Sequence, residues 1–303
     1  MNAKEEALLA EAKEILEKNW EDSYTVPSPD LYPHQWNWDS AFVALGYSRY
    51  NRDRAEKELL SIFEGQCDNG MLPHIVFRRK SDYFPGPDYW ETDLSENSPS
   101  IKTSAITQPP VHAIAALQVY ENSIEGEKVE SFLEKIFPKI LDFHNYLFEE
   151  RDPEKLGLVT IFHPWESGFD NSTRWDEALA RIEVQNLPEY VRTDTNKIDS
   201  DQRPKKESYD KYIYLVELMK RQNYKEELFY DEFPFKIKDV VFSSILYDAN
   251  ECLLKMAEIL GEDDSMIRGW MRRTEDNYLE YFCIDKEREV LAYDFDLITN
   301  RSV

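Results

Sequence analysis

Residues 242–261, FSSILYDANECLLKMAEILG, carry the clearest periodic pattern in this sequence. Their apolar side chains recur at the spacing of one face of an α-helix. Gly261 follows the last of them, which is typical of a helix C-cap. Residues 111–120, VHAIAALQVY, are instead apolar on nearly every side, as in a helix that is buried all round. One-sided helices and fully buried helices in one chain predict two concentric layers of helices.

The helical period extends over most of the chain. It predicts further helices around residues 8–16, 55–63, 129–147, 212–219 and 267–282. Pro138 interrupts the third of these and should kink or restart it, because proline lacks a backbone N–H. Extended structure is favoured only by residues 71–77, 158–162 and 290–298. No domain linker or repeat is visible, so we expect one all-α domain over residues 1–303.

The composition excludes several classes of protein. The 303 residues include 60 acidic and 36 basic side chains, a net charge of −24, which disfavours binding to nucleic acid or to an anionic membrane. No apolar run approaches the roughly 18 residues of a membrane span, and the charged N-terminus lacks a signal-peptide core. Three widely spaced cysteines argue against disulfides and zinc. We therefore expect a cytoplasmic protein.

The sequence has no motif typical of metal, phosphate or dinucleotide binding. The five histidines lack metal-ligand spacing, and there is no phosphate-binding loop or dinucleotide motif. We therefore expect no metal and no cofactor. His144 lies on an apolar helix face and should be a core histidine. Two long polar stretches, residues 81–103 and 187–208, should form loops, and loops this long are usually binding or lid segments and otherwise disordered.

Three segments crowd aromatic, amide and carboxylate side chains together. The first is residues 32–40, YPHQWNWDS. Asn37 or Asp39 could cap a helix while the tryptophans fill core. Alternatively the indoles stack on a sugar ring and the Asp and Asn oxygens accept its hydroxyl protons. The second, residues 103–110, offers Gln108 to a hydroxyl pair, although a capping role is equally open, and Pro110 fits a first helical turn.

The third segment, residues 163–176, is HPWESGFDNSTRWD. Thr173 and Asp176 satisfy a capping box, but this leaves the residues before them unexplained. Gly168, which can bring backbone close to a ligand, lies between the carboxyl groups of Glu166 and Asp170. An aromatic pocket disfavours a charged carboxylate, so its pKa would rise toward that of a general acid. Glycoside cleavage needs such an acid and a second carboxylate.

These segments resemble a known family. YPHQWNWDSAF, GMLPHIVF, TSAITQPPVHA, HPWESGFDNSTRWD and SYDKYIYLVELMKRQNY, in this order, are similar to the mannosylglycerate and glucosylglycerate hydrolases in the group around glycoside hydrolase family sixty-three. The resemblance implies an (α/α)6 barrel, a six-hairpin toroid, and inverting hydrolysis of an α-linked glucose or mannose. A small sugar or glycosyl-glycerate would be the substrate.

The resemblance also implies roles for individual residues. Asp170 would be the general acid. The pocket of the cleaved sugar would be lined by Tyr32, Trp38, Asp39, Gln108, Trp165, Gly168 and Tyr209. Arg78 and Arg79 would either meet an anionic aglycone or balance the acidic surface.

Two departures from the family pattern are visible. The family usually has proline where this chain has Thr173. Family members also continue beyond the part that matches residues 293–296, through segments that complete the barrel and supply the base glutamate, for which this chain has no counterpart. We therefore expect an incomplete barrel without that base, and the alternative to an enzyme is a non-catalytic sugar-binding fragment of the same fold. Exposed apolar edges would favour a homo-oligomer or a complementing C-terminal chain.

Overall fold

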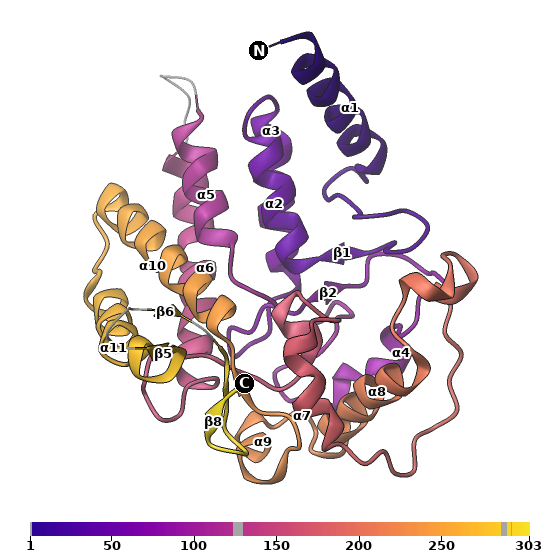
Figure 1. Ribbon diagram of the computed structural model, residues 1–303. Helices are drawn as coiled ribbons and strands as arrows, with labels where there is room; N and C mark the ends of the chain where they lie inside the picture. Colours follow the sequence, from indigo (N-terminus) through magenta and orange to yellow (C-terminus); the bar gives the residue numbers. More distant parts are fainter. Residues whose placement is uncertain (1, 124–129, 286–289, 292) are drawn as a thin grey trace.

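Three helical hairpins form the body of the molecule. The computed structural model describes residues 2–123, 130–285, 290–291 and 293–303. The hairpins are α2 (Asn37–Tyr47) with α3 (Arg52–Ile62), α5 (His112–Glu121) with α6 (Glu130–Glu149), and α10 (Val240–Leu260) with α11 (Ser265–Phe282). Figure 1 shows α2, α5 and α10 side by side across the upper part of the molecule.

The hairpins form two layers. Helix α5 contacts α2 on one side and α10 on the other, so these three make an inner row. Helices α3, α6 and α11 pack against the inner row from outside, and α3 also contacts α6. The prediction of a two-layer, all-α arrangement is confirmed. The prediction of one domain over residues 1–303 stays a prediction.

Sequence features explain how the long helices end and continue. Helix α10 ends at Gly261, which adopts a left-handed conformation with φ 71°, as the C-cap prediction required. Helix α6 runs through Pro138 as one element, so the predicted restart is wrong. Proline removes a single hydrogen bond here, and the buried side chains Phe132, Ile136 and Ile140 hold the helix to the core on both sides of it.

Helix α1 (Ala3–Asn19) is joined to the body mainly at its C-terminal end. There the Tyr47 hydroxyl donates to the Leu16 carbonyl (2.9 Å). Leu8 and Ile15, on the predicted apolar face, are 67% and 59% exposed. The predicted helix is therefore present, while most of its apolar face lies uncovered in this structure.

Four further α-helices and several short strands complete the described part of the structure. The helices are α4 (Pro87–Trp90), α7 (Asp176–Ala180), α8 (Lys206–Arg221) and α9 (Glu226–Glu232). The strands are β1 (Gln35–Trp36), β2 (Ile75–Val76), β3 (Thr160–Ile161), β4 (Ile237–Lys238), β5 (Cys283–Asp285), β6 (Val290–Leu291), β7 (Phe295–Asp296) and β8 (Arg301–Ser302). Strand β1 pairs with β2, β5 pairs with β6, and β3, β4, β7 and β8 form one antiparallel sheet. Strands β2, β3, β6 and β7 lie within the three predicted stretches but are shorter than predicted, and residue 292 of the last stretch lies outside the described residues. Strands β1, β4, β5 and β8 lie outside those stretches, so the prediction that extended structure occurs only there is wrong.

Several predicted helix starts are wrong. Helix α7 begins at Asp176 without a side-chain cap, and Ser172 rather than Thr173 caps the 3-10 turn before it. Helix α5 begins at His112, so Pro110 precedes its first turn. Helix α2 has no side-chain cap, because the Asn37 amide instead donates to the carbonyls of residues 72 and 73. In the case of Asn37, a tertiary contact takes the place of the predicted cap, and local patterns do not report such contacts.

Within the described residues, no helix is both long enough and apolar enough to cross a membrane.

Candidate active site

A tight turn after strand β3 carries the third aromatic motif. Strand β3 leads into a 3-10 helix, η3 (Pro164–Ser167), where the backbone N–H of Trp165 donates to Nδ1 of His163 (3.0 Å). The Ser167 hydroxyl donates to the Pro164 carbonyl (2.6 Å) and accepts from the Phe169 N–H (2.9 Å). These bonds fix the turn before it reaches Asp170.

Gly168 ends η3 in a conformation that favours glycine. Its φ is 73°, and a Cβ built on it would lie 2.3 Å from two ring atoms of Trp38. Trp38 comes from the first turn of α2, and its backbone N–H is 3.5 Å from Oε1 of Gln108. The structure therefore brings Trp38, Gly168 and Gln108 together, although they lie far apart in the sequence.

A pocket opens beside this turn. It encloses about 780 Å³ of empty space, part of it open to solvent. Five of the predicted residues line it: Tyr32, Gln108, Trp165, Asp170 and Tyr209. Trp38, Asp39 and Gly168 do not line it. Gly168 and Trp38 pack against each other beside it, and Asp39 is near enough to Asp170 for its charge to be felt there.

Asp170 is partly buried and electrostatically unusual. Burial raises its pKa to about 7, the charge of Asp39 adds to the rise, and a backbone hydrogen bond and Arg203 oppose it. Its own carbonyl accepts from the Tyr212 hydroxyl (2.9 Å), which holds the residue at the pocket. Burial also raises the pKa of Asp39, to about 6. Near neutral pH, a large share of Asp170 therefore carries a proton that could be donated.

Trp165 lies in an aromatic cluster. Its ring centroid is 4.5 Å from that of His163, 6.1 Å from Tyr209 and 6.2 Å from His74, which stacks nearly parallel to it. Such a surface suits the apolar face of a small ring. His163 is buried, and burial lowers its pKa to about 4, so it is neutral.

One wall of the pocket is charged, and no sequence pattern predicted it. Arg203, Asp194 and Lys197, all from the predicted loop at residues 187–208, line it. Arg203 donates to Asp194 (2.7 Å) and to the Tyr32 hydroxyl (2.9 Å), and Arg192 also pairs with Asp194 (2.6 Å). Burial alone would raise the pKa of Asp194, but the two arginines outweigh it and lower it to about 2. The grouping of Arg192, Lys197 and Arg203 in one loop of a strongly acidic chain was the sequence signal that could have predicted this wall.

Aromatic residues of the other predicted loop were also missed. Tyr83 and Phe84 line the pocket together with Trp36 and His74. Tyr83 makes an edge-to-face contact with Trp36 (5.3 Å between centroids), and the Tyr209 hydroxyl donates to the Phe84 carbonyl (3.3 Å). Both long loops therefore contribute to one pocket.

The remaining candidates lie elsewhere. Arg78 donates to Gln35 and Glu64, Arg79 donates to Glu21, and neither lines the pocket. Of the two interpretations of these arginines, the structure favours charge balance. Glu166, the second carboxylate of the third motif, is buried in an ion pair with Arg151 (2.8 Å) and does not face the pocket.

In the described part of the chain, no group of three or more His, Cys, Asp or Glu side chains is arranged to hold a metal ion. His144 is a buried core residue, whose Nδ1 bonds to Oδ1 of Asn250 (2.8 Å). The expectation that neither metal nor cofactor takes part stays a prediction.

The sequence and the helical fold of this chain have counterparts among known proteins. Residues 32–298 match the family described as the mannosylglycerate hydrolase MGH1-like glycoside hydrolase domain. The chain therefore belongs to this family.

Curated relatives agree with this assignment. The chain is 45% identical over 275 residues to a mannosylglycerate hydrolase of Rubrobacter radiotolerans, covering 89% of this chain and 62% of that protein. It is 38% identical over 306 residues to a glucosylglycerate hydrolase of Mycolicibacterium hassiacum, covering 97% and 68%. The chain thus spans about three fifths of the length of several of the relatives that it matches.

A solved structure extends the likeness to three dimensions. A crystal structure of a GH63 mannosylglycerate hydrolase from Thermus thermophilus, in complex with Tris and D-glycerate, matches with a TM-score of 0.91 at 42% identity. The match covers 98% of this chain and 70% of that one. The expected helical-toroid class of fold is confirmed, and the relatives named above are glycoside hydrolases.

Proposed function

We propose that this chain carries the acid side of an inverting glycoside hydrolase acting on an α-glucoside or α-mannoside of glycerate. The observation that carries the proposal is Asp170, a carboxyl group with a pKa near 7 at the wall of an aromatic pocket. A carboxylic acid that stays protonated near neutral pH can protonate the leaving oxygen of a glycosidic bond.

The other predicted residues have complementary roles in this proposal. Trp165, Tyr32 and Tyr209 supply aromatic walls for the substrate. Gln108 lines the pocket and would exchange hydrogen bonds with sugar hydroxyls, while Asp39, which does not line it, raises the pKa of Asp170 through its charge. Trp38 and Gly168 fix the shape of the turn that presents Asp170.

Two cationic side chains at the pocket indicate how the aglycone would bind. Arg203 and Lys197 are cations at the same pocket, and Arg203 already bonds to a hydroxyl group, that of Tyr32. A small acid with hydroxyl groups, such as glycerate, matches this wall, because a guanidinium can bind a carboxylate with two parallel bonds. The names of the relatives and the D-glycerate complex of the Thermus enzyme support glycerate as the aglycone.

The test measures release of glycerate from glucosylglycerate and from mannosylglycerate, for the wild-type chain and for Asp170→Asn. We expect Asp170→Asn to abolish turnover, while the exposed control Asp88→Asn leaves it unchanged. In the wild type, activity should fall as pH rises through about 7, because Asp170 then loses its proton. Full activity of Asp170→Asn, or an unchanged rate well above that pH, would contradict the proposal.

A second candidate is a sugar-binding domain of the same fold that does not catalyse. It is favoured by the state of Asp194, the other carboxylate on the described pocket wall, which two arginines hold as an ion pair. An inverting reaction needs a free carboxylate to activate water, and Asp194 in its ion pair does not offer one. Saturable binding of glucosylglycerate without turnover would support this candidate.

Association is the remaining part of the proposal. A second copy of the chain or a complementing C-terminal chain would cover apolar side chains such as Leu8 and Ile15, which are exposed here. Light scattering across a concentration series tests self-association, and a constant monomer mass would contradict it. Location in the cytoplasm stays a prediction.

A further inference from the structure

Glu166 is a buried carboxylate behind the pocket wall. It is 0% exposed and is not part of the pocket lining. Its oxygens accept hydrogen bonds from the backbone N–H groups of Phe162 (2.7 Å) and Thr107 (3.3 Å). The Arg151 guanidinium adds two more bonds, from Nη1 (3.0 Å) and Nη2 (2.8 Å). Both carboxylate oxygens are therefore engaged, and Glu166 cannot itself contact a ligand in the pocket.

The two backbone partners belong to the two segments that build the sugar side of the pocket. Thr107 directly precedes Gln108, and Phe162 directly precedes His163, whose ring accepts from the N–H of Trp165. One side chain therefore joins the segment with Gln108 to the turn with Trp165. These segments lie more than 50 residues apart in the sequence, as the separation of 59 between Thr107 and Glu166 shows.

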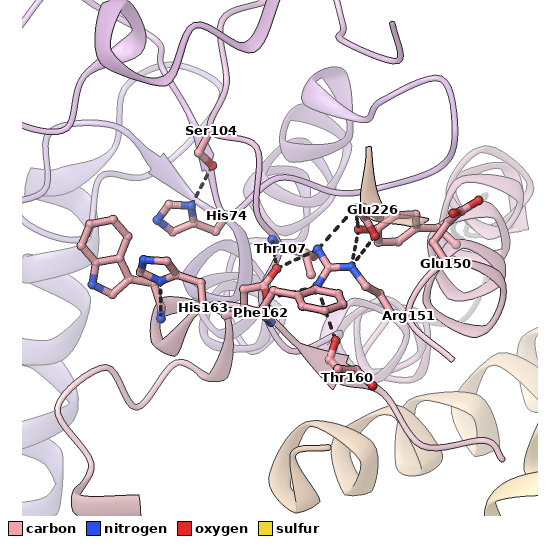
Figure 2. Close-up of polar contacts among 12 residues, drawn as sticks. His74, Ser104, Thr107, Glu150, Arg151, Thr160, Phe162, His163 and Glu226 are labelled. Carbon is pink, nitrogen blue, oxygen red and sulfur yellow. Dashed lines mark hydrogen bonds and ion pairs between the residues drawn. The ribbon is translucent and has the colours of Figure 1, made fainter. Parts of the chain in front are cut away.

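Arg151 anchors this connection to the body of the molecule. It is 1% exposed and lies two residues after the end of α6, and its Nε donates to Glu226 of α9 (2.5 Å) and to the Tyr146 hydroxyl (2.9 Å). Figure 2 shows Arg151 between Glu226 and the segment that carries Thr107. Burial raises the pKa of Glu226, and the charge of Arg151 opposes that rise. One cation therefore serves two buried carboxylates, so removing Arg151 would leave both of them without a counter-ion.

We propose that Glu166, held by Arg151, is a positioning residue that clamps the turn carrying Trp165 and Asp170 onto the segment carrying Gln108. Its meaning for catalysis rests on the function proposed above. The clamp acts through the backbone at Thr107 and Phe162, and it sets the distance between the acid and the residues that orient the sugar. It should therefore govern the rate of the chemical step more than the affinity for substrate.

The test compares Glu166→Gln and Arg151→Lys with the matched control Asp296→Asn. Asp296 is also 0% exposed and pairs with one arginine, Arg181, and with backbone N–H groups, but it lies in the β7–β8 hairpin and does not line the pocket. We expect Glu166→Gln to lower kcat by about 10- to 100-fold with little change in KM, because small displacements of reacting groups cost this much. Arg151→Lys, which keeps the charge but not the two-bond geometry, should have an intermediate effect.

Hydrogen exchange supplies a readout that does not depend on activity. In Glu166→Gln, amide exchange should accelerate in residues 103–108 and 162–170, while Asp296→Asn, at a similar loss of urea midpoint, should leave these segments as in the wild type. If the wild-type chain releases no glycerate, the proposed function fails, and selective exchange in the two segments still supports the clamp. Equal exchange in Glu166→Gln and Asp296→Asn would overturn the clamp, as would a kcat of Glu166→Gln no lower than that of the control.

Discussion

Two loops line the same pocket but are held by different forces. The turn at residues 163–170 is fixed by short-range bonds to the backbone and by close packing of Gly168 against Trp38. The loop at residues 187–203 is held by ion pairs and by stacking, including Arg192 over the ring of Tyr209 (4.1 Å) and Tyr190 on Phe84 (5.2 Å). The first loop presents the proposed acid, and the second presents the cations.

The two carboxylates of the pocket show what this difference does. Asp170, in the packed turn, has its pKa raised to about 7 by burial, whereas two arginines lower that of Asp194 to about 2. Packing therefore produces a proton donor on one wall, and pairing produces a permanent ion on the other. Substitutions in the packed turn should cost stability, while substitutions in the charged loop should cost binding.

The largest effect, a loss of folding stability, is expected for Gly168→Ala. The new Cβ would lie 2.3 Å from the Trp38 ring in a left-handed backbone conformation. We expect a loss of about 3 kcal/mol in the free energy of unfolding, from overpacking together with backbone strain. Gly261→Ala is the matched control, since it has a similar φ of 71° but no atom within 4 Å. It should lose only about 1 kcal/mol, and equal losses in urea unfolding would show that packing against Trp38 contributes nothing.

The difference between the loops also explains what the sequence could predict. The long helices were found because their apolar spacing is local and repeats over many residues, as in α10. The turn with Gly168 and Asp170 was found because it interrupts such patterns with residues that helices do not need. Local composition marked the segments that contain Tyr32 and Gln108 but left a capping role open for Gln108, and the resemblance to a family then assigned both residues to the sugar pocket.

What escaped prediction depends on contacts between distant residues. Arg203 bonds to Tyr32 across 171 positions, and a single sequence does not reveal such a pair. Glu166 lies four residues before Asp170 in the sequence, yet its side chain is buried against Arg151 and does not line the pocket, which no local pattern indicates. Exposure of the apolar face of α1 likewise depends on what packs beside it, which periodicity does not determine.

The next effect in size is expected for Arg203→Met. Loss of the guanidinium should weaken binding of free glycerate by roughly 10- to 100-fold, since a hydrogen bond to a charged group contributes about 1.5–3 kcal/mol. Calorimetric titration with glycerate measures this change. Arg79→Met removes an arginine that pairs with Glu21 away from the pocket, so it should bind glycerate as the wild type does. If Arg203→Met bound glycerate as tightly as the wild type does, the charged loop would not form the aglycone site.

The smallest effect is expected for Lys197→Met. Its ammonium pairs with Asp82 (2.8 Å) and so joins the two long loops, but the side chains are 26% and 69% exposed. An ion pair this open to water contributes little to folding stability, because solvent and salt screen it. We expect the urea midpoint to stay close to that of the wild type, and any difference to vanish at high salt. A double-mutant cycle with Asp82→Asn isolates the pair, and a coupling that persists at high salt would mean that the charged loop is held as firmly as the packed turn.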